Sequence, residues 1–65
     1  MEVSRTQILE VLEEYIHNRT DRKVMEVYLT DRPRSLEALA DEMELSVSTV
    51  KRIINRNSFI YKYLP

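Results

Sequence analysis

The sequence contains no cysteine, no glycine and only two prolines among its 65 residues. Without cysteine the chain can form neither a disulfide nor a cysteine-ligated metal site. Without glycine it has few places where a positive φ is cheap, which argues against an all-β fold built on hairpins. Both prolines lie outside the segments with periodic apolar residues. We therefore expect an all-α fold, a small bundle of about four helices joined by short connections.

Long apolar runs are also missing, and so is the basic-then-apolar pattern of a signal peptide. These absences predict a soluble cytoplasmic protein with no membrane partner. The chain has no nucleophile–base pairing, no cluster of metal ligands and no glycine-rich phosphate loop, so we expect no enzyme activity and no cofactor. A core this small leaves no room for a small-molecule ligand. The length fits one domain, which we expect to span residues 1–65.

Acidic residues are missing from the last third of the chain. All 11 of them lie between Glu2 and Glu44, so six basic side chains leave residues 1–44 with a formal charge of −5. Residues 45–65 carry +4, from Lys51, Arg52, Arg56 and Lys62. Chance, or complementary faces within a dimer, would explain the split. Segregation this complete favours a face that binds a polyanion.

Two helices are predicted in the acidic half. Ser4 and Gln7 have the spacing of a capping box, and the apolar residues after them predict an amphipathic helix over residues 5–17. Its outer face is acidic and unsuited to DNA, so we interpret it as scaffold or as a protein-binding surface. Thr20 or Asp21 is expected to cap a second helix.

The second helix is expected to end at Arg32-Pro33, because the residue before a proline is pushed out of the helical region. Asn57 is expected to stop the last helix, because asparagine tolerates left-handed geometry. The tail, residues 58–65, is too apolar for a free end, so it either covers the core or pairs with another copy.

Residues 35–56 have the spacing pattern of a helix-turn-helix, with Ser35 and Ser46 in position to cap its two helices. The pattern needs a small residue where the helices cross, an apolar residue in the turn, and two apolar anchors three residues apart on the second helix. The chain supplies these, in that order, as Ala40, Leu45, Val50 and Ile53. The turn usually carries glycine where this chain has Glu44. Glutamate there costs about 1 kcal/mol or requires a different turn.

This packing would direct the outward face of the second helix, about residues 47–56, into the major groove of DNA. Base contacts are expected from Val47, Ser48, Lys51, Arg52 and Asn55. Arg52 can donate two hydrogen bonds to guanine, and Asn55 can form two with adenine. Phosphate contacts, which position the helix without reading sequence, are expected from Arg34, Ser35, Ser46, Thr49 and Arg56. An ordinary solvated face would also carry basic residues, but it would not be free of acids.

The stretch from residue 21 to residue 53 resembles region four of bacterial sigma factors and related short phage and bacterial regulators. The segments that carry the resemblance are DRKVMEVYL at 21–29, SLEALA at 35–40 and LSVSTVKRI at 45–53. The resemblance covers about residues 20–57, and Glu44 departs from the family's pattern. It implies a role in transcription regulation, possible contact with RNA polymerase, and DNA contacts for Ser46, Ser48, Thr49, Lys51 and Arg52.

The sequence leaves two functions open. We expect a transcription regulator that binds double-stranded DNA sequence-specifically, in the cytoplasm and on the nucleoid. The alternative is an adaptor that binds RNA polymerase or another regulator and uses the helix-turn-helix as a scaffold. The acid-free outward face of the last helix favours DNA. Because one recognition helix reads only a few base pairs, we also expect a homodimer, formed through the first helix or the tail.

Overall fold

The computed structural model describes residues 4–64, so residues 1–3 and 65, the ends of the predicted domain, lie outside the described residues. Its elements are α1 (Arg5–Tyr15), α2 (Arg19–Thr30), α3 (Leu36–Met43), α4 (Val47–Arg56) and a 3-10 helix, η1 (Ser58–Tyr63). The predicted all-α fold is confirmed, and residues 4–64 contain no strand. None of the described helices is long and apolar enough to cross a membrane.

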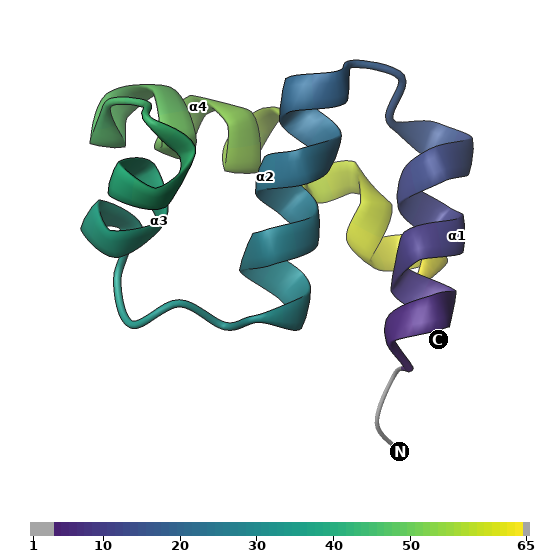
Figure 1. Ribbon diagram of the computed structural model, residues 1–65. Coiled ribbons are helices and arrows are strands. Elements are labelled where there is room, and N and C mark those ends of the chain that lie inside the picture. Colours follow the sequence, from purple (N-terminus) through teal and green to yellow (C-terminus); the bar gives the residue numbers. More distant parts are fainter. Residues whose placement is uncertain (1–3, 65) are drawn as a thin grey trace.

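Helix α2 lies at the centre of the molecule (Figure 1). It runs antiparallel to α1 on one side and packs against α3 and α4 on the other, while η1 returns from the end of α4 to α1. One apolar cluster joins α2 to the α3–α4 pair and is formed by Val24, Val27, Leu39, Ala40, Val50 and Ile53. A second joins α2 to α1 and η1 and is formed by Ile8, Leu12, Ile16, Met25 and Ile60. Helices α1, α3 and α4 are thus held on α2, whereas η1 packs on α1 and α4.

The predicted capping box of α1 is confirmed. Gln7 N donates to Ser4 Oγ at 3.1 Å, and Ser4 N donates to the Gln7 side chain at 3.0 Å. The helix ends at Tyr15, two residues before the predicted end. Ile16 adopts extended backbone geometry and is buried in the second cluster, so the chain leaves the helix there in order to bury an apolar side chain.

The predicted cap of α2 was wrong. Asn18 is the cap, and its side chain accepts a 3.0 Å hydrogen bond from Asp21 N. The helix also ends earlier than predicted, at Thr30. Arg32 has a φ of 48°, so the residue before Pro33 does leave the right-handed helical region, as expected.

Helix α4 ends at Arg56 with Asn57 as its C-cap, which confirms the predicted place of the stop, but the geometry of the stop differs from the prediction. Asn57 has a φ of −102° and is not left-handed. Its side chain is buried instead, and its amide donates to Ile53 O at 2.8 Å. The chain then forms η1, which places Ile60 fully inside the second cluster with Leu64 packed against it. The tail therefore covers the core, one of the two expected outcomes.

Glu44 follows α3 and has a φ of 58° and a ψ of 40°, the left-handed geometry that the pattern assigns to glycine. The turn is kept without its usual residue, at a cost of about 1 kcal/mol for a side chain with a Cβ atom. We therefore predict that Glu44→Gly raises the free energy of unfolding by up to about 1 kcal/mol, measured by chemical denaturation.

The matched control is Glu42→Gly, two residues earlier and inside α3. There glycine gains nothing from a positive φ and weakens the helix, so the free energy of unfolding should fall by about 1 kcal/mol. Equal losses for the two variants would contradict the left-handed turn.

Candidate nucleic-acid interface

The helix pair α3–α4 packs as the spacing pattern predicts. Ala40 is only 3% exposed at the crossing, where a larger side chain would push the helices apart. Leu45 packs against the same cluster from the turn, and its N–H donates to Ala40 O at 2.8 Å. Val50 and Ile53 are buried on the inner side of α4. These contacts fix which face of α4 points outward.

Four of the five predicted base-contact residues lie on that outer face. Ser48, Lys51, Arg52 and Asn55 are all exposed. Val47 differs from the prediction, because it is half-buried and packs against the core cluster of the helix pair. Its position at the first turn of α4 places it at the edge of the outer face, between the core and the exposed residues.

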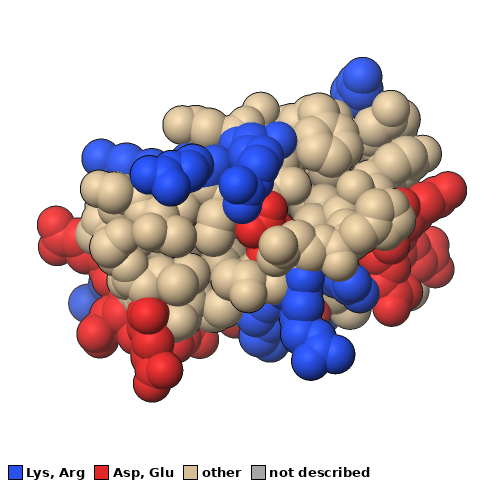
Figure 2. Space-filling model, turned by 90° about the horizontal axis from the view of Figure 1, so that it is seen from above, with Lys and Arg blue, Asp and Glu red and all other residues tan. Residues whose placement is uncertain are grey.

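The face that contains these residues is basic. Figure 2 shows Lys and Arg side chains along one edge of the view and a second group below its centre, while most acidic side chains gather at the two ends. Along α4 every charged side chain is basic. The face therefore combines hydrogen-bond donors with a positive charge, which suits a polyanion.

The N-terminal ends of α3 and α4 are capped by the predicted serines. Ser35 Oγ accepts from Ala38 N at 3.1 Å, and Ser46 Oγ accepts from Thr49 N at 3.1 Å. The hydroxyls of Ser46 and Thr49 also share a 2.8 Å hydrogen bond. Both side chains are thus partly occupied by local contacts. Arg34, next to Ser35, is exposed.

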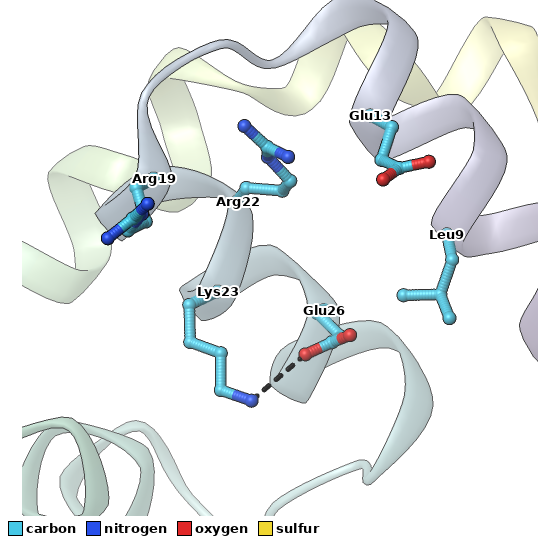
Figure 3. Close-up of a pocket in the computed structure, with 6 residues that line it drawn as sticks. All are labelled: Leu9, Glu13, Arg19, Arg22, Lys23 and Glu26. Carbon is cyan, nitrogen blue, oxygen red and sulfur yellow. Dashed lines mark hydrogen bonds and ion pairs between the residues drawn. The ribbon is translucent and has the colours of Figure 1, made fainter.

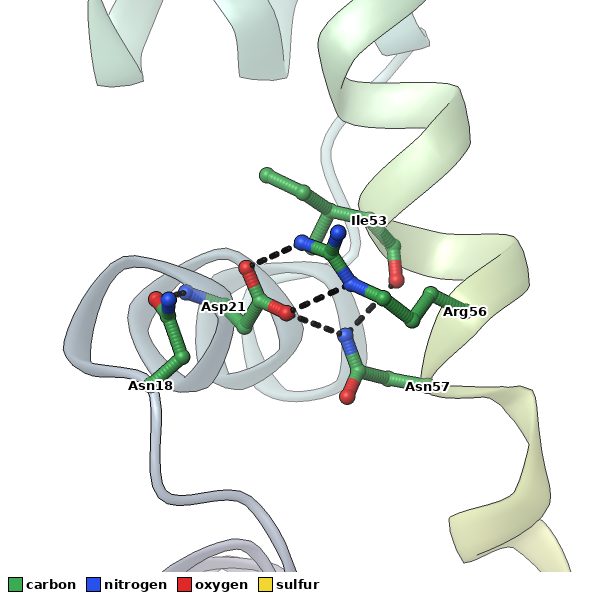
Figure 4. A network of polar contacts seen from close by, with 5 residues as sticks. All are labelled: Asn18, Asp21, Ile53, Arg56 and Asn57. Atoms are coloured by element: carbon green, nitrogen blue, oxygen red, sulfur yellow. Dashed lines mark hydrogen bonds and ion pairs between the residues drawn. The ribbon is translucent and has the colours of Figure 1, made fainter.

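The far end of α4 is held by a buried carboxylate from α2 (Figure 4). Asp21 is 5% exposed and accepts three side-chain hydrogen bonds. Arg56 Nη2 donates to Oδ1 at 2.8 Å, Arg56 Nε donates to Oδ2 at 3.0 Å, and Asn57 Nδ2 donates to Oδ2 at 3.0 Å. We call these three residues the Asp21 network. It links the start of α2 to the end of α4.

The Asp21 network occupies part of one predicted phosphate-contact residue, Arg56. Arg56 was expected to contact phosphate, but two of its nitrogens are directed to Asp21. About half of its side chain remains exposed. Sequence reasoning missed the role of Asp21, although its spacing before Val24 and Met25 places an acid on the buried side of α2. An acid in such a position needs a basic or amide partner.

A second surface lies on η1 and the end of α1. Phe59, Tyr61 and Tyr63 are each 43% exposed, and the Tyr63 ring stacks on Tyr15 with centroids 4.1 Å apart. Desolvation, with the nearby Glu14 and Tyr63, raises the pKa of Tyr15, and desolvation and Tyr28 raise the pKa of Tyr61. Both phenols are therefore neutral near pH 7, and the surface is aromatic with one cation, Lys62, whose Nζ lies 5.3 Å from the centre of the Tyr63 ring.

Among residues 4–64 no group of three histidine, cysteine or acidic side chains is placed to hold a metal ion. The sequence model of one protein family, the Mga helix-turn-helix domain, matches residues 4–63. No curated protein and no solved structure matches the chain.

The Asp21 network generates a stability prediction. Asp21→Asn removes the charge that Arg56 and Asn57 both bind and sets the new amide against that of Asn57. We expect the free energy of unfolding to fall by about 1–3 kcal/mol, measured by denaturant titration.

The matched control is Glu26→Gln on the same helix. Glu26 forms an ion pair with Lys23 at 3.1 Å, and the lysine side chain of that pair is more than half exposed. An exposed pair contributes at most about 1 kcal/mol, and we expect less than that here. A loss for Asp21→Asn no larger than that for the control would show that the network does not hold α4.

Proposed function

The chain belongs to the Mga helix-turn-helix domain family and is thus a DNA-binding helix-turn-helix domain, and from this premise we propose that it binds double-stranded DNA sequence-specifically as a transcription regulator. The observation that carries the proposal is the outer face of α4, where donors are exposed and no acid is present. A helix in the major groove meets base edges between two rows of phosphates. Donors and positive charge are both favoured there.

Each residue of the face has a role in this proposal. Arg52 donates to guanine and Asn55 pairs with adenine, while Ser48 and Lys51 bond to neighbouring base edges. Val47, at the edge of the face, makes an apolar contact with a thymine methyl group. Phosphate contacts come from residues at both ends of the helix pair: Arg34, Ser35, Ser46, Thr49 and Arg56. Arg56 would use the part of its guanidinium that Asp21 leaves open.

A partner protein is the second candidate, and the aromatic surface on η1 favours it. Three large aromatic side chains exposed on six residues form a patch of the kind that protein interfaces use. The exposed acidic face of α1 is a further candidate contact. We propose these surfaces for a homodimer, or for RNA polymerase, which is the partner that the resemblance to region four of sigma factors implies. We propose no catalytic activity and no cofactor, and we place the protein in the cytoplasm, on the nucleoid.

Removal of the charge on α4 tests DNA binding directly. Lys51→Ala combined with Arg52→Ala should abolish duplex binding near 0.15 M salt, because both side chains lie on the face proposed to enter the groove. Helicity measured by circular dichroism should stay unchanged, since both side chains are exposed. For each phosphate contact that is lost, the slope of log K against log salt should flatten by about one unit.

The matched control removes two positive charges elsewhere, with Arg5→Ala on α1 and Lys62→Ala on η1. Binding by this variant should stay close to that of the unmodified protein. An affinity of the unmodified protein that hardly changed with salt would overturn the DNA proposal.

Selection of bound duplexes from a random pool separates the remaining alternatives. We expect enrichment of a short motif with guanine and adenine at the positions read by Arg52 and Asn55. A palindrome with half-sites about 34 Å apart would support a homodimer, and an asymmetric site would support a polymerase-coupled role. No enrichment would contradict sequence-specific reading and favour the adaptor.

A further inference from the structure

Three basic residues at the start of α2 are not used by the helix-turn-helix. They line one side of an open groove between α1 and α2 with a volume of about 400 Å³ (Figure 3). The groove is lined by Leu9 and Glu13 from α1 and by Arg19, Arg22, Lys23 and Glu26 from α2. Basic residues thus outnumber acidic ones in it.

Two of the three basic side chains are available to a ligand. Lys23 is bound to Glu26 through a 3.1 Å ion pair, which leaves the two arginines. Arg19 is exposed, and within residues 4–64 no salt bridge involves Arg19 or Arg22. The Nε atom of Arg22 is buried and has no hydrogen-bond partner among the described residues. This atom is closed to a ligand at the rim of the groove, so Arg22 would contribute its charge and its remaining N–H donors.

The Asp21 network fixes this groove relative to α4. Asp21 lies between Arg19 and Arg22 in the sequence and is bound to Arg56 at the end of α4. The start of α2 and the end of α4 are therefore neighbours, and both lie at the same side of the molecule in Figure 1. Seen from that side, Figure 2 shows two groups of basic side chains on one face.

We propose that Arg19 and Arg22 form a second phosphate site, which binds the sugar-phosphate backbone of the duplex that α4 reads. The inference rests on the proposed function, because the ligand is a backbone phosphate of the same duplex whose major groove holds α4. The described backbone as a whole extends 29 by 22 by 16 Å, and each strand of B-DNA carries one phosphate per about 3.4 Å of duplex axis. In this proposal a backbone contacted at the end of α4 continues past the start of α2, which the Asp21 network holds beside it.

Arginine is the residue suited to this task, because its planar guanidinium donates two parallel hydrogen bonds to one phosphate. Glu13 on the opposite wall repels an anion that enters deeply. Phosphate therefore binds at the rim formed by Arg19, and the inward Arg22 adds charge and donors from below. The site contributes affinity and register but no base reading.

The test compares Arg19→Ala and Arg22→Gln with Arg5→Ala, which removes the same charge from the start of α1. Each of the first two variants should make the slope of log K against log salt less steep by about 0.9. If the variant and the unmodified protein bind equally at 1 M salt, the variant then binds roughly fivefold more weakly at 0.15 M salt. The selected DNA motif should not change. Arg5→Ala should leave the slope unchanged.

Phosphate ethylation interference locates the contact. The unmodified protein should show interference at a phosphate flanking the segment protected by α4, and Arg19→Ala should lose that signal alone. If duplex binding depends on Lys51 and Arg52 but Arg19→Ala and Arg22→Gln both behave like Arg5→Ala, the second site is wrong and the proposed function stands. If the unmodified protein binds no duplex, both are wrong.

Discussion

The buried carboxylate of Asp21 is the contact on which the placement of α4 depends. Apolar packing at Ala40 and Val50 holds α4 against the core, but dispersion and burial are not directional and allow a helix to slide or rotate. The Asp21 network adds three hydrogen bonds of 2.8–3.0 Å with fixed donors and acceptors. Because the carboxylate is shielded from water, leaving it unpaired would be costly. The outer face of α4 is therefore held in one orientation relative to α2.

The same constraint extends along the chain in both directions. Before α4, the left-handed Glu44 and the plug Leu45 set the angle at which the helix begins. After α4, the side-chain amide of Asn57 donates hydrogen bonds to Asp21 and to Ile53 O. The chain then forms η1, which buries Ile60 beside α1. In a chain of this length each cluster alone is small. Their connection through α2 makes the position of α4 a property of the whole fold.

The helix-turn-helix could be predicted because its determinants are local. A small residue, a plug and two anchors at fixed intervals identify the crossing, and Ser35 and Ser46 identify the helix starts. Asp21 could not be assigned in this way. Thr20 or Asp21 was expected to cap α2, but the Asp21 carboxylate is bound by Arg56, which is 35 positions further along the chain. Asn57 was misjudged for the same reason, since its burial against Asp21 is a tertiary contact. Val47 was placed on the outer face by its spacing along the helix, but it packs against the core. Helical spacing gives the direction of the buried side of a helix and not its width.

The charge asymmetry of the sequence acquires a physical meaning in this arrangement. Asp21, the acid bound at the end of α4, is paired with Arg56, which reduces its repulsion of a polyanion. The exposed acids of α1 and α3 gather away from that face. A duplex approaching the acidic ends would meet like charge, whereas the face that carries α4 and the start of α2 attracts it. The net charge of −1 is therefore compatible with DNA binding, because the same acids that lower it restrict the protein to one way of approaching the duplex.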